Sequence, residues 1–319
     1  MLILTEEEIR GALSMDGAIR AVEDAFAALA RGEARLPGVI GLEIPESRGE
    51  VHVKGAHLAG APYYVFKVAS GFWSNEERGL PVSGGLVMAF DAATGAPAAI
   101  LLDNGYLTDL RTGAAGGVAA KHLAKKSPRR IAMIGAGIQG RFQLRALARI
   151  FGTLPPVAAW SLRPENAAAY ARDMAEELGA QVEAVPTVEA AVSGADLIVT
   201  STPSREPLVR AEWLAPGAHV TAVGSDGPDK RELHVDVLAR ADRVFADSLS
   251  QCLRLGEIHH AVEAGVLREQ DVAGELGDVI LGRIPGRRSD EEITVADLTG
   301  VGVQDAGVAM AALRGLGGG

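Results

Sequence analysis

The first hundred residues show two hydrophobic patterns. Apolar residues recur at every third or fourth position over residues 15–31, which predicts an amphipathic helix. Before it, Thr5 is followed three residues later by Glu8, a capping-box pattern that predicts the start of another helix. Short apolar runs bounded by turn residues then predict the strands of a mostly antiparallel sheet, at residues 51–54, 63–69, 84–91 and 97–103.

The pattern changes in the middle of the chain. A segment rich in alanine and glycine predicts a helix over residues 106–124. The polar residues 125–129 follow it, and beyond them the pattern of apolar residues is different. Continuous apolar runs there predict strands that alternate with helices: strands at 131–135, 157–160, 181–184 and 196–200, and helices at 138–150, 164–178 and 187–193. Strands without polar alternation are typical of a parallel sheet covered on both faces. We therefore predict an α/β fold, with a Rossmann-type doubly wound parallel sheet preceded by an α+β region.

Composition narrows the classes of function. The 319 residues carry a formal charge of −10 at pH 7, so the chain is a poor candidate for binding nucleic acid or an anionic membrane. No apolar run approaches the roughly 20 residues of a membrane span, and the first residues lack the basic and apolar stretches of a secretory signal. The single cysteine, Cys252, forms neither an internal disulfide nor a zinc site alone. We expect a cytoplasmic protein.

A glycine-rich turn indicates a dinucleotide site. Gly135, Gly137 and Gly140 form the pattern G-x-G-x-x-G, with Ile138 and Gln139 between the last two glycines. The hexapeptide is weak evidence alone, but here it follows a predicted strand and opens a predicted helix, which is the context that the motif requires. The glycines allow a tight turn and a close approach to a pyrophosphate, and the helix N-terminus offers free N–H groups to that anion.

The end of the next strand bears on the choice of coenzyme. NAD sites usually place a carboxylate there to bind the ribose hydroxyls. This chain instead has Ser161 and Arg163, which suit a 2′-phosphate, so we favour NADP over NAD. The alternative for Arg163 is a solvated arginine at the start of a helix. Thr202 and Pro203 follow the strand 196–200 and are expected to contact the cofactor, unless they form an ordinary loop.

Several separate motifs, in order along nearly the whole chain, resemble those of the ornithine cyclodeaminase/μ-crystallin family. The segments that carry the resemblance are residues 67–70, 79–81, 107–112, 135–140, 223–233 and 299–305. The resemblance implies a homodimer of two-domain subunits. Residues 1–124, joined by about 300–319, would form the substrate-binding and dimerisation domain, and residues 125–299 would form the NAD(P)-binding Rossmann domain. The shared chemistry of such proteins is hydride transfer between a nicotinamide and the α-carbon of an amino acid or its imine.

The resemblance also assigns roles to four residues. Arg111 would bind the substrate carboxylate, and Thr112 would bind a cofactor phosphate. Lys67 would face the substrate carboxylate or the α-nitrogen; its strand also looks buried, where an unpaired ammonium would be costly. Asp226 would lie near the substrate nitrogen and handle its proton. The alternatives are a surface lysine for Lys67 and a turn-forming aspartate for Asp226.

The chain departs from the family pattern at one place. Many members carry an arginine in a Pro-x-Arg segment after the second helix, but the matching residues 36–40 contain none. Lys54 stands in a nearby predicted strand where many members have methionine. Our hypothesis is that Lys54 replaces the lost positive charge and binds substrate. The alternative is a solvated lysine on an edge strand.

Other candidate residues are assigned no chemistry. His259 and His260 resemble a metal pair, but adjacent residues do not share a helix face and no cluster of cysteines or carboxylates accompanies them, so we expect no metal. Together with Glu257 they are expected to lie in a helix. Asp305 is expected to cap a C-terminal helix near the cofactor.

We therefore expect an enzyme, an NAD(P)-dependent oxidoreductase that acts on the C=N or CH–NH bond of an α-imino or α-amino acid. One alternative is a cyclodeaminase-like lyase, in which hydride leaves and returns within one turnover and ammonia is released from a diamino acid. Another alternative is a non-enzymatic binding protein similar to μ-crystallin. Retention of Lys67, Arg111 and Asp226 argues against the last alternative.

Overall fold

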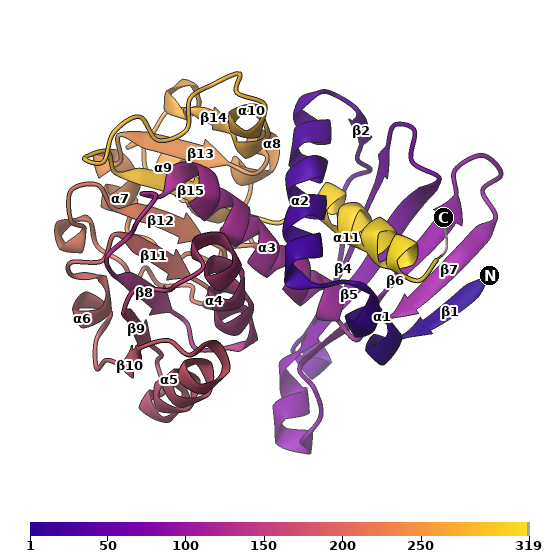
Figure 1. Ribbon diagram of the computed structural model, residues 1–319, viewed down its shortest axis with the longest axis horizontal. Helices are drawn as coiled ribbons and strands as arrows, with labels where there is room; N and C mark the ends of the chain where they lie inside the picture. The colour runs from indigo at the N-terminus through magenta and orange to yellow at the C-terminus, as the bar shows by residue number, and fades with distance from the viewer. Residues whose placement is uncertain (318–319) are drawn as a thin grey trace. The chain divides into compact units, whose positions relative to one another are not determined.

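The computed structural model describes residues 1–317, and the chain divides into two compact units (Figure 1). Unit 1 comprises Met1–Arg111 together with the described residues from Val301 onward, and unit 2 comprises Thr112–Gly300. The last two residues of the predicted C-terminal segment lie outside the described residues. The division lies inside helix α3 (Tyr106–Leu123) rather than after its end. The functional roles of the two parts stay a prediction.

Unit 1 is built on a seven-stranded sheet in the order β1-β7-β6-β5-β4-β2, with β3 paired to β4. Its strands are β1 (Leu2–Thr5), β2 (Ala34–Arg35), β3 (Ile40–Ile44), β4 (Gly49–Leu58), β5 (Tyr63–Phe72), β6 (Ser83–Asp91) and β7 (Pro97–Leu102). Strands β4 to β7 pair antiparallel, as predicted. Strands β1, β2 and β3 were not predicted. Strand β1 is short, buries only Leu4, and pairs parallel to β7 at the edge of the sheet.

The helices of unit 1 are α1 (Glu6–Ala12), α2 (Met15–Ala30) and α11 (Gly302–Gly315), with the 3₁₀ turns η1 (Pro45–Ser47) and η2 (Trp73–Arg78). The capping box at α1 is confirmed, because the Thr5 side chain accepts from the Glu8 amide and the Glu8 carboxylate accepts from the Thr5 amide. Figure 1 shows α2 and α11 on one face of the sheet. Helix α11 is buried over nearly its whole length, so even its polar residues must find partners inside the protein.

Unit 2 contains an eight-stranded sheet in the order β10-β9-β8-β11-β12-β15-β13-β14, in which every pairing is parallel. Its strands are β8 (Ile131–Ile134), β9 (Val157–Trp160), β10 (Val182–Ala184), β11 (Leu197–Thr200), β12 (His219–Ala222), β13 (Arg243–Ala246), β14 (Gly274–Glu275) and β15 (Thr294–Asp297). The doubly wound parallel sheet is confirmed. The prediction ended at the fourth strand, and the structure adds four more.

Helices alternate with these strands. They are α4 (Ile138–Phe151), α5 (Pro164–Leu178), α6 (Val188–Val192), α7 (Val235–Arg240), α8 (Leu249–Cys252), α9 (Gly256–Glu263) and α10 (Leu276–Ile280), with the 3₁₀ turns η3 (Ala211–Trp213) and η4 (Glu269–Asp271). Strands β8, β11, β12 and β15 are buried at every residue, because helices cover both faces of a doubly wound sheet.

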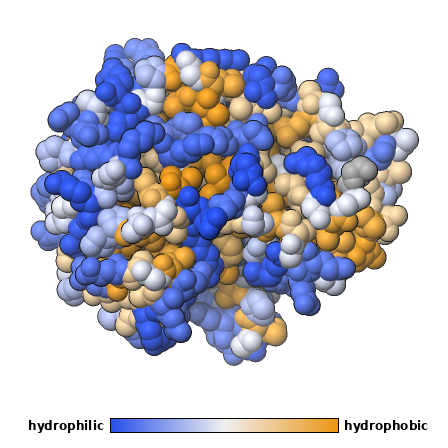
Figure 2. All heavy atoms as spheres, in the orientation of Figure 1, coloured by the Kyte–Doolittle hydropathy of each residue, from blue (hydrophilic) through white to orange (hydrophobic). Residues whose placement is uncertain are grey.

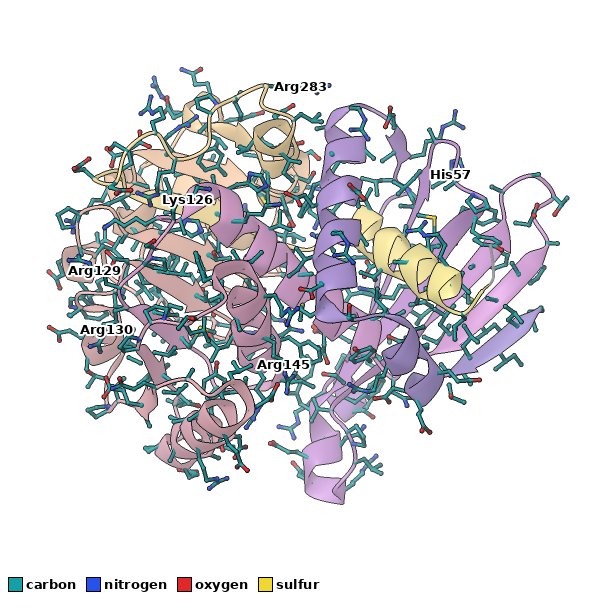
Figure 3. The ribbon with its side chains drawn as sticks, in the orientation of Figure 1. His57, Lys126, Arg129, Arg130, Arg145 and Arg283 are labelled. Atoms are coloured by element: carbon teal, nitrogen blue, oxygen red, sulfur yellow. The ribbon has the colours of Figure 1, made fainter. Side chains whose placement is uncertain are left out.

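The polar segment before β8 is tied to the sheet. Asp196, at the start of β11, accepts hydrogen bonds from Lys125 Nζ at 2.7 Å and from the Arg129 amide at 2.8 Å; Arg129 is labelled in Figure 3. Burial acts to raise the pKa of Asp196, but the bonds from Lys125 and Arg129 outweigh it and lower the pKa to about 2. Residues 125–129 therefore belong to the folded body of unit 2 rather than to a linker.

Exposed apolar residues gather at one edge of unit 1. Met1, Leu2 and Ile3 are all at least half exposed, and Figure 2 shows the corresponding orange patch where β1 lies. In the part of the chain that the structure describes, no helix has the length and apolarity to span a bilayer. The cytoplasmic location stays a prediction.

Candidate active-site clusters

Two lysines oppose each other on adjacent strands of unit 1. The antiparallel register of β4 and β5 pairs Lys54 directly with Lys67, so both side chains lie on the same face of the sheet. Like charges directly opposite each other are destabilising unless an anion lies close by. Lys67 is 3% exposed, which makes its need for a counter-charge stronger.

The counter-charge comes from the last helix of the chain. Asp305 of α11 is buried, and its Oδ1 accepts from Lys67 Nζ at 2.9 Å and from Arg111 Nε at 3.1 Å. The adjacent Gln304 Oε1 accepts from Arg111 Nη1 at 2.9 Å, which fixes the plane of the guanidinium. We refer to Lys54, Lys67, Arg111 and Asp305 as the cationic cluster.

The expectation for Asp305 was wrong. The residue at the cap of α11 is Val301, and no side chain caps the helix there. Asp305 points into unit 1 instead, where it holds the two buried cations that the sequence assigned to substrate binding. The sequence did contain a signal: a buried Lys67 requires a carboxylate, and Asp305 lies in the last segment that carries the family resemblance.

The cluster brings three basic side chains to one carboxylate. Lys54, Lys67 and Arg111 are the basic groups, and all three act to lower the pKa of Asp305. Burial acts to raise that pKa, but Lys67 and Arg111 outweigh it and hold the pKa below its ordinary value, so Asp305 is ionised. A carboxylate matches the fork of an arginine, so the buried Arg111 guanidinium is suited to a further anion of this kind.

The pKa of Lys67 falls in the range where a proton is easily exchanged. Burial is the main cause that lowers this pKa, the charges of Arg111 and Lys54 also lower it, and the Asp305 carboxylate acts to raise it; together they bring the pKa to about 8. Asp103 lies close enough for Lys67 to affect its titration, and burial raises the pKa of the Asp103 carboxyl. Lys67 is therefore suited both to binding an anion and to transferring a proton near neutral pH.

Two buried polar atoms at the cluster can each form a further hydrogen bond. Among the described residues, Oδ2 of Asp305 and Nε2 of Gln304 are buried without a hydrogen-bond partner. Buried polar groups are normally satisfied, so each unpartnered atom needs an explanation. A bound ligand that offers a donor to Asp305 and an acceptor to Gln304 would supply it.

The glycine-rich turn of unit 2 has the geometry of a dinucleotide loop. Gly135 adopts φ of +116°, and a Cβ there would lie 2.7 Å from the Ser201 carbonyl oxygen, so only glycine fits. At Gly137, which begins α4, a Cβ would meet nothing within 4 Å. The backbone is therefore open where a pyrophosphate would approach the N-terminus of α4. The helix N-terminus and the open cradle fit a dinucleotide.

The other predicted cofactor residues also lie in unit 2. Ser161 and Arg163 follow β9, and Arg163 stands exposed at the N-terminus of α5. Thr202 and Pro203 follow β11, with Thr202 held by Glu232. Thr112 is the first residue of unit 2, and its carbonyl accepts from Gln143 Nε2 of α4 at 2.9 Å. Their contacts with a cofactor stay a prediction.

Asp226 also belongs to unit 2. It lies in the loop after β12, and its Oδ1 accepts from Lys230 Nζ at 2.8 Å. Its side chain is 51% exposed, so a ligand has access to the carboxylate. Its assignment to the substrate nitrogen stays a prediction.

Glu232 is a residue that sequence analysis quoted but assigned no role. Its Oε1 accepts from the Thr202 amide at 2.5 Å, and its Oε2 accepts from the Gly224 amide at 2.7 Å. The hydroxyls of Thr200 and Thr202 add one hydrogen bond to each side of the carboxylate. This one buried side chain joins the loops that follow β11 and β12, which include the predicted cofactor residue Thr202.

A second buried carboxylate supports the first. Glu257 of α9 accepts from the amides of Glu232 and Leu233, at 2.7 and 3.2 Å. Burial raises its pKa well above the ordinary value, and nearby Asp297 and Glu232 add to that shift. Glu257 lies in a helix, as expected, and fixes the backbone on which Glu232 stands.

The chain is similar to known proteins over almost its whole length. The sequence profile of the Ornithine cyclodeaminase/mu-crystallin family matches residues 1–313. The chain is 43% identical to alanine dehydrogenase of Archaeoglobus fulgidus over 308 residues, which cover 97% of this chain and 92% of that protein. It is 39% identical to iminosuccinate reductase of Paracoccus denitrificans over 315 residues, which cover 98% of this chain and 96% of that protein.

Solved structures are similar over almost all of the chain. An archaeal alanine dehydrogenase, described as a dimer with bound NAD, is 41% identical with a TM-score of 0.92, covering 99% of this chain and 95% of that one. Delta(1)-pyrroline-2-carboxylate reductase of Thermococcus litoralis, in complex with NADH and L-proline, is 31% identical with a TM-score of 0.94 and coverages of 99% and 97%. These relatives bind NAD or NADH.

Replacing Glu232 by glutamine tests its role in holding the two loops. The amides of Thr202 and Gly224 each donate to a different carboxylate oxygen, so a glutamine leaves one of them facing an NH₂ group. We expect the variant to lose about 2 kcal/mol of stability and about 5 °C in melting temperature. Thermal unfolding measures this, with the exposed Glu269→Gln as the matched control. Equal melting temperatures for the two variants would contradict the assignment.

Proposed function

We propose that this chain, which belongs to the ornithine cyclodeaminase/mu-crystallin family, is an NAD(P)-dependent oxidoreductase. It reduces the C=N bond of an α-imino acid, or oxidises the CH–NH bond of the corresponding α-amino acid. The observation that carries the proposal is the cationic cluster, in which the buried Lys67 ammonium and Arg111 guanidinium meet at one oxygen of Asp305. Two buried cations held in this way suit the carboxylate that these substrates share. Relatives named as alanine dehydrogenase, iminosuccinate reductase and pyrroline-2-carboxylate reductase act on substrates of this kind.

Within the cluster, each residue has a distinct task. Arg111 binds the substrate carboxylate through its guanidinium, and Lys67 contributes the second cation. Asp305 accepts from both and holds them in place, because its Oδ1 is shared between them. Lys54, opposite Lys67 in the sheet register, supplies the positive charge that the missing family arginine would have given.

Two residues are suited to proton transfer. Asp226 accepts the proton of the substrate nitrogen, or returns it, as the carboxylate that remains accessible in its loop. Lys67, with a pKa lowered to about 8, provides a second exchangeable proton beside the bound carboxylate. Direct participation of Asp226 rests on the family resemblance.

The glycine-rich loop holds the nicotinamide dinucleotide, with the N–H groups at the start of α4 directed to its pyrophosphate. When bound, the nicotinamide supplies or accepts the hydride. The chain shapes this site through Glu232, which fixes the neighbouring loops. For the coenzyme we retain the preference for NADP, because Ser161 and Arg163 follow β9 where a carboxylate would be needed for the ribose of NAD. The bound NAD of relatives makes NAD the alternative.

We also propose a homodimer, as the archaeal alanine dehydrogenase forms. Both ends of the sheet in unit 1 support it, because Leu2 and Ile3 of β1 and Ile40 and Leu42 of β3 expose at least half of their surface. Exposed apolar side chains concentrated in one unit are typical of a surface that another subunit covers.

The first experiment follows nicotinamide absorbance. Purified protein is mixed with NADPH or NADH, a 2-oxo acid (pyruvate or oxaloacetate) and ammonia, or with preformed Δ1-pyrroline-2-carboxylate. We expect oxidation of the coenzyme that depends on both the acid and the amine. Absence of oxidation with every pair, together with ammonia release from a diamino acid, would replace the proposal by the cyclodeaminase alternative. Absence of both would favour a binding protein.

The Lys67 ammonium predicts a pH dependence of substrate affinity. Because its pKa is about 8, Lys67 is charged below pH 8 and loses its charge above it. We expect the KM for a 2-oxo acid, at constant free ammonia, to rise as the pH passes from 7 to 9. Lys67→Arg should remove this rise, because a guanidinium stays charged.

Lys67→Met tests the same group by loss of function. We expect kcat/KM to fall at least about 100-fold, because the variant lacks both the charge of Lys67 and its transferable proton. Lys126→Met, at an exposed lysine labelled in Figure 3, is the control and should retain full activity. A wild-type KM that does not change across this pH range would exclude the role given to the Lys67 charge.

Arg163→Ala tests the coenzyme preference. A charge-assisted hydrogen bond to a 2′-phosphate contributes about 1.5–3 kcal/mol, so the KM for NADPH should rise about tenfold or more while that for NADH stays within twofold. Arg172→Ala, an exposed arginine on the same helix, is the control. Equal effects on the two coenzymes would assign Arg163 to the solvated alternative.

A further inference from the structure

Two histidines and a glutamate lie together on helix α9, apart from any role given above. One ring nitrogen of His259, one ring nitrogen of His260 and a carboxylate oxygen of Glu263 all lie within 4.8 Å of one another. His259 and Glu263 are one turn apart on the same face, with Nε2 and Oε2 separated by 3.9 Å. No metal was expected here, because adjacent histidines do not share a helix face and no cluster of carboxylates accompanies them; Glu263, four residues after His259, supplies one carboxylate.

The hydrogen bonds of His259 determine which nitrogen holds the lone pair. Its Nδ1 lies 3.2 Å from the carbonyl oxygen of Leu253. A carbonyl only accepts, so Nδ1 must carry the proton. Neutral His259 therefore presents the lone pair of Nε2, the nitrogen nearer to Glu263.

His260 is fixed in the complementary way. Its Nε2 lies 2.9 Å from the carbonyl oxygen of Lys230, so Nε2 is the donor and Nδ1 holds the lone pair. Metal-binding histidines commonly donate their other N–H to a backbone carbonyl or carboxylate, which fixes the tautomer and strengthens the ligand. Both histidines of this cluster have that arrangement before any metal is present.

We propose that His259 Nε2, His260 Nδ1 and the Glu263 carboxylate form a site for a divalent transition metal of the Zn²⁺ class. Two imidazoles and one carboxylate are a known set of zinc ligands, with the fourth position left to water. Glu263 is 74% exposed, so its side chain has room to turn inward and the ion has access from solvent.

The site would also fix the loop that carries Asp226. The Lys230 carbonyl that accepts from His260 also accepts from the Ser225 hydroxyl, and Lys230 Nζ pairs with Asp226. A metal on Nδ1 makes the N–H at Nε2 a stronger donor, because it withdraws electron density from the ring. Binding of the metal would therefore hold residues 224–233 more firmly.

Calorimetric titration of the chelator-treated full chain with Zn²⁺ tests the site, and the visible spectrum of bound Co²⁺ reports its geometry. We expect one saturable Zn²⁺ per chain. Glu263→Gln should weaken the affinity about tenfold or more, and His259→Gln should weaken it further. The Glu263 side chain is 74% exposed, so Glu263→Gln does not threaten the fold and tests the site even if His259→Gln is destabilised. The controls are His57→Gln, labelled in Figure 3 and outside the cluster, and Glu269→Gln.

Three outcomes would overturn the proposal: no saturable binding, unchanged affinity in both ligand variants, or an equal loss of affinity in the controls. The coupling is measured separately by hydrogen exchange. Zn²⁺ should slow exchange of the amides of residues 224–233 in the wild type but not in His259→Gln, and unchanged exchange in the wild type would overturn the coupling. Neither measurement uses enzyme activity, so these results and those of the oxidoreductase assay are independent.

Discussion

The shared carboxylate oxygen of Asp305 is the interaction on which unit 1 depends. Two buried cations would repel each other and Lys54 without it, and burial of an unpaired charge costs far more than an exposed ion pair gains. Asp305 uses a single oxygen, Oδ1, for both cations, and its Oδ2 is buried without a hydrogen-bond partner among the described residues. The pairing therefore permits burial of Lys67 and Arg111 and leaves part of the carboxylate available to a ligand.

In unit 2, a buried carboxylate holds the loops beside the glycine-rich turn. A Rossmann loop needs backbone N–H groups that stay directed outward, so the loops beside it must be held from within. Glu232 does this by accepting from the amides that follow β11 and β12, and Glu257 supports Glu232 in turn. The buried carboxylate of Asp305 acts as a counter-ion for two side chains, whereas that of Glu232 acts as an acceptor for backbone amides and hydroxyls.

The sequence correctly predicted the features that depend on residues close together along the chain. The capping box at Thr5, the parallel sheet and the G-x-G-x-x-G turn depend on near neighbours in sequence, and the structure confirms each one. Strand β1 was not predicted, because it has only four residues and only one of them, Leu4, is buried. The partnership of Lys67 with Asp305 joins residues 238 positions apart, and no periodicity carries that information. The requirement for a partner was predictable from the buried lysine, but its identity was not.

The placement of α11 has a consequence for how the protein is made. Unit 1 is interrupted by all of unit 2, and the helix that carries Asp305 is translated only after residue 300. Unit 2 is assembled from strand–helix neighbours and can fold as it leaves the ribosome, whereas the contacts between α11 and β5 have very high sequence separation. Until α11 docks, Lys67 and Arg111 remain without their counter-ion. The cationic cluster is therefore completed only after unit 2 has been translated, and a chain stalled before that helix lacks the carboxylate that pairs with both cations.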